Sequence, residues 1–346
     1  MRIAPFVCSP PLPPQGTTKL LLRRAGRKVA LLLSAIGAFS AATVVTAGYP
    51  DRPIRFIVPS APGGGADIIS RFFTAELAKQ LGQQFVIDNR PGASGTIGVG
   101  MLVKSSPDGY TLGYGNMVYL SINRVFLPQQ PYDVDKDVQP VTQFTSSHNL
   151  LAVRLTLPVR SVPELIDYAK KNPGKLTYAS SGNGTTLHLS GELFKQLTST
   201  QIVHVPYKAV MQAITDLIGG QIDLIFDNQT SVTPYVKAGR LRGLAVTGPT
   251  RATLFPELPT LAEAGVPGYE ITTWGAMIAP AGVPKAVVAR LSAETNKGCS
   301  SPTLKDNLDS IGSRCVGSTP EQFAEFLKKE NAKWAGIVRR AGAKID

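Results

Sequence analysis

The sequence has few of the residues that metal sites and disulfide-rich folds require. Its 346 residues include three cysteines and three histidines. No Cys-x-x-Cys pair occurs, and His148, His188 and His204 are far apart along the chain. Such a distribution gives little support to a zinc site. We therefore expect no metal and no cofactor.

Signatures of phosphate binding and of nucleophilic hydrolysis are also missing. The chain contains no Gly-x-x-x-x-Gly-Lys-Ser/Thr loop and no Gly-x-Ser-x-Gly elbow. The glycine-rich stretches that begin at Gly63 and Gly182 do not complete Gly-x-Gly-x-x-Gly, because Ile68 and Leu187 stand at the third glycine position. An enzymatic function therefore has no motif to support it.

Dense runs of positive charge are absent from the main part of the chain, although its net charge is +12. The six basic residues of segment 1–47 account for half of that charge and are accompanied by no acid. Basic residues elsewhere are interleaved with acids and form no cluster with aromatics, so we expect no nucleic-acid partner. A moderate positive field still favours the approach of anions.

The first 47 residues have the order of a secretory signal peptide. Arg23, Arg24, Arg27 and Lys28 precede the apolar stretch 29–45, and small residues lead up to Ala47. We expect cleavage near Ala47; an uncleaved membrane anchor is the alternative. Arg23-Arg24 alone does not decide between the general and the twin-arginine export routes. No later segment is apolar over about 18 residues, the length that a membrane span needs.

Two cysteines remain when the signal peptide and its Cys8 are left out. Exported proteins form disulfides readily, so Cys299 and Cys315 are predicted to be bonded to each other. Two free thiols are the alternative.

Short strand-like runs alternate with helical patterns throughout residues 48–346. Ile54–Val58 predicts a strand, and the helix after it should bury Phe73, Leu77 and Leu81, with Ile69 on the same face. A second such unit has a strand at Leu176–Ala179 and a helix with Leu189, Leu193 and Leu197 inward. Capping signals stand at Ser161 and Thr319, and a further helix is expected to begin at Tyr207-Lys208. This alternation predicts an α/β fold with two domains.

Each unit has a glycine-rich loop between its strand and its helix. Such a loop directs backbone N–H groups at one point, where the helix dipole adds positive potential, and so favours an anion. Two loops that face each other would hold both ends of one anionic molecule. The candidate ligand-binding residues are Pro62, Gly63, Gly64, Gly65, Ala66 and Asp67 in the first loop, and Ser180, Ser181, Gly182, Asn183, Gly184, Thr185 and Thr186 in the second.

Five polar positions have competing interpretations. Asp227 ends an apolar strand, where it either contacts ligand or caps the next turn. His148 is expected to be a surface or hinge residue, His188 to pack locally and His204 to be a hydrogen-bonded core or edge residue. Asp67 is favoured as a first-turn acid that stabilises its own helix.

Several segments together resemble a known family. They are Pro59 to Arg71, Asp88 to Gly95, Pro107 to Leu112, Asn172 to Tyr178, His204 to Lys208, Ala238 to Thr247, Pro267 to Glu270 and Trp274. The residues of these segments and the order of the segments resemble those of the Bug family, the receptors of tripartite tricarboxylate transporters. The resemblance covers essentially all of residues 48–346. Ala209 and Gln212 depart from the family pattern, which usually has glycine and proline there.

The resemblance implies an α/β fold: a two-lobed periplasmic binding protein of the Venus-flytrap type, similar to the type II class. Each lobe would be a mixed sheet flanked by helices. Lobe 1 would join residues 48–149 to 273–346, and lobe 2 would span 150–272. It implies a periplasmic, non-enzymatic and monomeric receptor that binds a small carboxylic acid in the interdomain cleft, and membrane subunits of a tripartite transporter as partners. The alternative function is an exported α/β hydrolase acting on a small ester or amide. The identity of the acid stays open.

Overall fold

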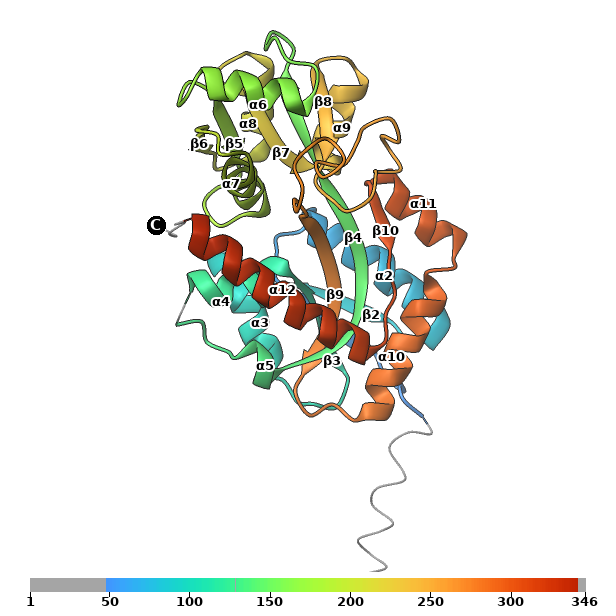
Figure 1. Cartoon of the computed structure of the whole chain (residues 1–346). Helices are drawn as coiled ribbons and strands as arrows, with labels where there is room; N and C mark the ends of the chain where they lie inside the picture. Colours follow the sequence, from blue (N-terminus) through green and yellow to red (C-terminus); the bar gives the residue numbers. More distant parts are fainter. Residues whose placement is uncertain (1–47, 128, 342–346) are drawn as a thin grey trace, which may run out of the picture. The chain divides into compact units, whose positions relative to one another are not determined.

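The strands form two hydrogen-bonded groups that share one long strand (Figure 1). The computed structural model describes residues 48–127 and 129–341. The predicted signal peptide, 1–47, lies outside the described residues. The first group contains β2 (Phe85–Asn89), β1 (Ile54–Val58), β3 (Thr111–Asn116), β9 (Thr272–Pro280), β4 (Val138–Arg154) and β10 (Ser313–Cys315). The second contains β8 (Leu241–Val246), β4, β7 (Leu224–Asn228), β5 (Thr177–Ser180) and β6 (Val203–Pro206).

Both groups are mixed sheets. In the first, β1 pairs in parallel with β2 and β3, as short strands joined through helices do. In the second, β5 pairs in parallel with β6 and β7. β4 is antiparallel to every strand it pairs with. The α/β class expected from the sequence is confirmed.

The shared strand β4 changes partners in its middle. Residues 138–148 pair with β9, and Asn149 to Arg154 pair with β7 and β8. The change falls between His148 and Asn149. One continuous strand thus connects the two groups.

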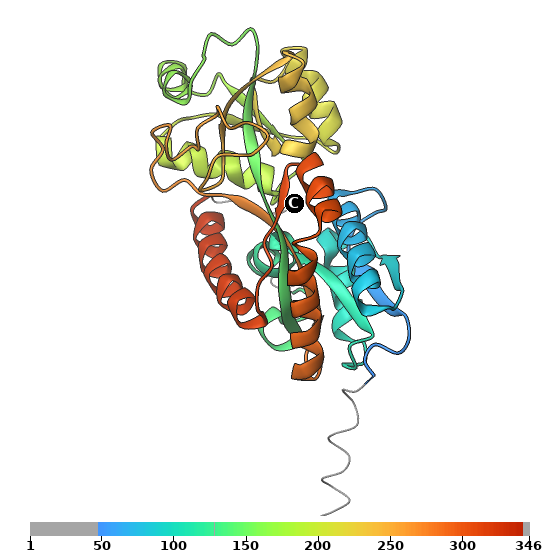
Figure 2. The same cartoon turned by 90° about the vertical axis from the view of Figure 1, so that its right-hand side faces the viewer.

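Helices cover these sheets. They are α2 (Gly65–Leu81), α3 (Thr96–Val103), η2 (Val118–Ile122), α4 (Asn123–Phe126), α5 (Val134–Asp137), α6 (Val162–Lys171), α7 (Thr186–Thr198), α8 (Val210–Ile218), α9 (Gln229–Lys237), α10 (Lys285–Gly298), α11 (Pro302–Ser310) and α12 (Pro320–Ala341), with a short turn η1 (Ala93–Gly95). Figure 2 places α12 and α2 on opposite sides of β4. Phe144 of β4 stacks on Phe73 of α2, with ring centroids 4.2 Å apart.

The predicted helix caps are present. The Ser161 hydroxyl accepts the Glu164 N–H at 3.3 Å. Thr319 and Gln322 are bonded in both directions, because each side chain accepts the backbone N–H of the other residue. Such caps satisfy donors that a helix start otherwise leaves open.

Two local predictions are wrong. Leu197 is 40% exposed, because it lies in the last turn of α7, beyond the part that packs on the sheet. The helix expected at Tyr207-Lys208 begins at Val210 instead. Tyr207 is held in the preceding extended segment, where its N–H donates to the Ser180 carbonyl and its hydroxyl to Asp216.

Cys299 and Cys315 are joined by a disulfide, with Cα atoms 5.6 Å apart. The bond connects the end of α10 to the end of β10 and closes the segment that carries α11. Within the described residues, no helix is both long enough and apolar enough to cross a bilayer.

We predict that removing this bond by Cys299→Ser and Cys315→Ser lowers the free energy of unfolding by about 3 kcal/mol, since a closed loop of this size restricts the unfolded chain. Urea denaturation of the double variant and the parent measures the difference. Equal midpoints, or two free thiols found by alkylation of the denatured parent, would contradict the prediction.

Candidate functional site

A cavity of about 520 Å³ lies where the two strand groups meet. Its size is within the range of small-molecule sites. Its lining comes from segments far apart in the sequence: Gly63, Gly64, Gly65, Ala66, Ile68, Ile69, Tyr114, Asn116, Met117, Val118, Thr145, Ser147, Thr186, Val210, Asn228, Thr230, Ser231, Thr273, Trp274, Ile311 and Ser313.

Four helices begin at this cavity. Gly65, Thr186 and Val210, the first residues of α2, α7 and α8, are among its lining. At the start of α9 the lining includes the N-cap Asn228 and the second residue, Thr230. No side chain caps the first turn of α2, α8 or α9, whose N-cap residues are Gly64, Ala209 and Asn228. Uncapped helix starts present N–H donors and positive potential, which together favour an anion.

The first glycine-rich loop contributes four of its six candidate residues to the cavity. Gly63, Gly64, Gly65 and Ala66 line it, whereas Pro62 and Asp67 do not. These four are small, so their backbone is accessible to a ligand from the cavity side.

Asp67 holds this loop in place from behind. It is buried, and its carboxylate accepts the Gly63 N–H at 2.9 Å, Arg71 Nε at 2.9 Å and Asn89 Nδ2 at 3.0 Å. Burial raises the pKa of Asp67, but the hydrogen bonds from Arg71, Gly63 and Asn89 outweigh it and leave the pKa below its usual value. Its contacts fit the expected role of an acid that stabilises the start of its own helix.

The second loop contributes only Thr186 to the cavity lining. Its other residues, Ser180, Ser181, Gly182, Asn183, Gly184 and Thr185, are not part of the lining. The loop is bonded to its own surroundings: Ser180 Oγ lies 2.6 Å from His204 Nε2, and the Gly184 N–H donates to His188 Nδ1 at 3.1 Å. Thr185 caps α7 by accepting the His188 N–H.

The histidines take different places. His188 and His204 stack with ring centroids 4.2 Å apart. Both are hydrogen-bonded to the second loop, which agrees with the local packing expected for His188 and the hydrogen-bonded position expected for His204. Of the two places expected for His148, surface or hinge, the surface is wrong, because the residue is 6% exposed. It lies where β4 changes partners, which leaves the hinge alternative standing. Burial lowers the pKa of His148 to about 4, with a smaller contribution from Arg314.

Asp227 is fully buried and does not line the cavity, although its neighbour Asn228 does. Its Oδ1 accepts the Asn228 N–H at 2.7 Å, and among the described residues its Oδ2 has no hydrogen-bond partner. Burial raises the pKa of Asp227 to about 7, against smaller lowering effects of Asn228 and Ser231. The carboxyl group is therefore largely protonated in mildly acidic solution.

A raised pKa makes the stability contribution of Asp227 depend on pH. The folded state favours the protonated form, so this contribution is present below the ordinary pKa near 4 and is lost as the pH rises toward about 7. Asp227→Asn removes the titrating group, so its stability lacks this dependence on pH. We predict that the difference in free energy of unfolding, Asp227→Asn minus parent, increases by about 1.4 kcal/mol per pH unit across this window. Urea denaturation at several pH values measures the difference. Parallel curves for the two proteins would show that the carboxyl group does not titrate in this way.

The parts of the lining that come from β3, η2, β4, α8, α9, β9 and the residues around the start of β10 were not predicted from the sequence. One signal was available: Thr145 and Ser147 stand two residues apart on one face of the strand, in the polar run 145–149 that precedes the apolar residues 150–153. Asn228 and Ser231 gave no such pattern. They line the cavity because α9 begins directly after β7.

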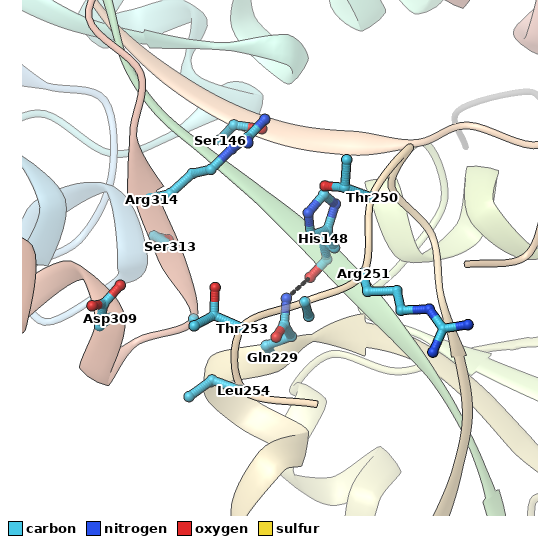
Figure 3. A pocket seen from close by; sticks show the side chains of 12 residues that line it. Ser146, His148, Gln229, Thr250, Arg251, Thr253, Leu254, Asp309, Ser313 and Arg314 are labelled. Atoms are coloured by element: carbon cyan, nitrogen blue, oxygen red, sulfur yellow. Dashed lines mark hydrogen bonds between the residues drawn. The ribbon is translucent and has the colours of Figure 1, made fainter. Parts of the chain in front are cut away.

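A second, smaller pocket of about 80 Å³ surrounds His148 (Figure 3). Gln229 Nε2 donates to the His148 carbonyl at 3.2 Å, and Thr250, Arg251 and Arg314 stand around the pocket. This volume suits a few water molecules rather than an organic ligand. In the part of the chain that the structure describes, no cluster of three His, Cys, Asp or Glu side chains is placed to hold a metal.

Comparison with known proteins identifies the family. Residues 69–343 match the model of the "Tripartite tricarboxylate transporter family receptor". BugT of Bordetella pertussis is 35% identical over 91% of this chain and 98% of its own. The structure of Rpa4515 of R. palustris, solved with adipate, is 38% identical in sequence and has a TM-score of 0.76. The match covers 86% of this chain and 100% of that one. A structure described as a periplasmic transporter is 41% identical with a TM-score of 0.75, again over 86% and 100% of the two chains.

These matches agree with the mixed α/β fold and with the resemblance found in the sequence. The family consists of non-enzymatic receptors, so the hydrolase alternative is wrong. The cavity among uncapped helix starts is the kind of site that such a receptor needs. The chain belongs to the tripartite tricarboxylate transporter receptor family of periplasmic solute-binding proteins.

Proposed function

We propose that this receptor binds a small carboxylic acid in the 520 Å³ cavity. The observation that carries the proposal is the convergence of four helix starts, three without a side-chain cap, on one cavity. A carboxylate placed there accepts backbone N–H bonds and is stabilised by the helix dipoles. The relative solved with adipate supports this ligand class.

Within the cavity, the carboxylate is held at Gly63 to Ala66 and at the start of α7, where Thr186 lies. The rest of the second loop, Ser180 to Thr185, supports this site through its bonds to His188 and His204. Asp227 acts indirectly, by fixing the strand end from which Asn228 enters the lining.

The two strand groups act as two lobes, residues 48–149 with 273–346 and residues 150–272, which close around the ligand. β4 supports this division because its pairing changes between His148 and Asn149. A hinge motion of this kind reduces the radius of gyration. Small-angle scattering with and without ligand tests it, and an unchanged radius with saturating ligand would contradict closure.

The receptor acts as a monomer in the periplasm, with a signal peptide removed near Ala47, and delivers its ligand to membrane subunits of a tripartite transporter. Mass spectrometry of the protein recovered from the periplasm tests the first part. The expected mass begins at or near Gly48, and a mass that includes Arg23 to Val45 would contradict cleavage.

A thermal-shift screen of mono-, di- and tricarboxylates tests the proposed ligand class. A ligand that binds only the folded state raises the midpoint, by an amount that grows with its concentration. We expect at least one carboxylate to do so, while its amide, which lacks the negative charge, does not. Equal shifts for an acid and its amide would contradict a site built for an anion.

A further inference from the structure

Tyr114 on β3 is almost completely buried, yet it lines the cavity. Its side chain is 4% exposed and belongs to the lining. Within residues 48–127 and 129–341, its hydroxyl group has no hydrogen-bond partner. A buried hydroxyl of this kind is costly to leave unpaired, so its position beside the cavity needs a reason.

Four other buried tyrosines show how the protein usually pairs such a hydroxyl. Tyr119 and Tyr132 each donate to a backbone carbonyl at 3.0 Å. Tyr178 and Tyr269 also donate to protein oxygens, at 3.1 Å or less. Tyr114 differs from these four because the space beside it is the cavity. The acceptor for its hydroxyl therefore has to come from a molecule in that cavity.

Gly275 on the neighbouring strand β9 makes room for this side chain. Tyr114 pairs with Met277, so Gly275, two residues away, lies on the same face of the sheet. A Cβ on Gly275 would overlap the Tyr114 hydroxyl oxygen and lie 2.8 Å from Cε2 and Cζ of the ring. Carbon atoms that are not bonded to each other prefer separations of about 3.5 Å or more. The ring can therefore cross the backbone of β9 only because residue 275 has no side chain.

The position of the ring sets what the hydroxyl can reach. β3 lies between β1 and β9, and the hydroxyl end of the ring lies at Gly275 of β9. The first glycine-rich loop follows β1, on the other side of β3, so Tyr114 can reach a part of the ligand that this loop does not hold. Burial raises the pKa of Tyr114 well above its ordinary value, with a smaller contribution from Tyr119. The group therefore stays protonated and can donate.

We propose that Tyr114 is a ligand-binding residue whose hydroxyl donates a hydrogen bond to an oxygen of the bound acid, and that Gly275 keeps the space for its ring. This inference rests on the proposed carboxylate site and adds to it a side-chain donor away from the helix starts. An oxygen at this position pairs the hydroxyl, whereas a methylene group leaves it unpaired. Tyr114 therefore favours acids that place an oxygen toward β9.

Tyr114→Phe tests the donor, because it removes the hydroxyl oxygen and keeps the ring. Calorimetry uses a fixed set of acids: succinate, adipate, malate, citrate and hexanoate. We expect the variant to bind the tightest of these roughly 10-fold or more weakly than the parent, as a lost hydrogen bond to a charged group requires. Its denaturation midpoint should stay the same or rise, because the lost hydroxyl has no partner among the described residues.

Tyr269→Phe is the matched control. The Tyr269 hydroxyl is buried, donates to the Ser190 carbonyl at 2.9 Å and lies outside the lining. We expect the opposite result for it, a lower denaturation midpoint and an unchanged affinity. Equal affinity of Tyr114→Phe and the parent for every acid that binds would overturn the inference and leave the carboxylate site standing. Binding of none of the acids to the parent would overturn both.

A second substitution tests the role of Gly275. We expect Gly275→Ala to weaken binding about 10-fold as well, since its methyl group displaces the phenol ring and so removes the same hydrogen bond. In a Tyr114→Leu background there is no phenol ring to displace, so Gly275→Ala should change the affinity by less than about two-fold. An equal loss of affinity in the two backgrounds would contradict the coupling between the two residues.

Discussion

Replacing Gly65 by valine is expected to abolish ligand binding and to leave the fold intact. Gly65 is the first residue of α2 and lines the cavity. A Cβ at this position meets no atom within 4 Å, and its φ angle is not in the left-handed region. The valine methyl groups would therefore occupy open cavity space beside the N–H donors of the helix start.

The expected loss is large because the blocked groups bind a charge. Hydrogen bonds to charged groups are worth about 1.5–3 kcal/mol each, so losing two of them weakens binding roughly 100-fold or more. Stability should change by less than about 1 kcal/mol, since glycine is itself unfavourable in a helix. Calorimetry measures the affinity, and urea denaturation measures the stability.

Gly219→Val is a matched control for this substitution. Gly219 ends α8, at the other end of the helix from Val210, and has a φ of −73°. A Cβ there would lie 3.4 Å from the Thr215 carbonyl oxygen, an ordinary contact. We expect unchanged affinity. Equal affinities of Gly65→Val and the parent would mean that the acid group is bound elsewhere. Gly182 is a poor choice for this test, because its φ of +113° would strain any other residue.

Removing the carboxylate of Glu330 is expected to cause a large loss of stability. Glu330 lies on α12 and is 4% exposed. Its Oε2 accepts the indole N–H of Trp274 at 2.8 Å and that of Trp334 at 2.9 Å, and Lys333 Nζ lies 2.7 Å from its Oε1. The cluster fixes α12 against β9 at Trp274, which also lines the cavity.

In Glu330→Ala, two buried indole N–H donors lose their acceptor and Lys333 loses its nearest carboxylate. Breaking a buried pair of this kind costs about 3–5 kcal/mol. Glu330→Gln keeps one oxygen acceptor and should be destabilised less. Glu325→Ala, on the exposed side of the same helix, is the control, and should change stability by less than about 1 kcal/mol. Denaturation curves compare the three, and a Glu330→Ala midpoint equal to that of Glu325→Ala would contradict the role of the cluster.

Local features of the fold were predictable because they depend on neighbouring residues. The Ser161 and Thr319 caps follow from residue types three positions apart. The buried face of α2 follows from the four-residue spacing of Phe73, Leu77 and Leu81. Leu197 fits the same spacing in α7, but its exposure depends on where the neighbouring sheet ends, which its own segment does not show.

The pairing of distant strands was harder to predict. β4 is antiparallel to four strands. The residues of β7, β8 and β9 that pair with it lie more than 70 positions further along the sequence. No pattern within β4 specifies which strand will pair with which half. The convergence of Thr145, Trp274 and Ser313 on one cavity therefore became visible only in three dimensions.

The two glycine-rich loops illustrate the same limit. Both have the strand–loop–helix order that directs N–H groups at an anion, yet the first supplies four lining residues and the second supplies one. The difference comes from side chains outside the second loop. His204, on the neighbouring strand, bonds Ser180, and His188, in the first turn of α7, accepts the Gly184 N–H, so these groups are already paired with protein side chains.

The most direct test of the central claim is a crystal structure with the tightest-binding acid. We predict a carboxylate oxygen within hydrogen-bonding distance of the backbone N–H groups at the start of α2, near Gly64 to Ala66, and of the start of α7 at Thr186, with the rest of the molecule inside the cavity. An acid group bound away from these helix starts, for example beside Arg314 in the pocket around His148, would contradict it.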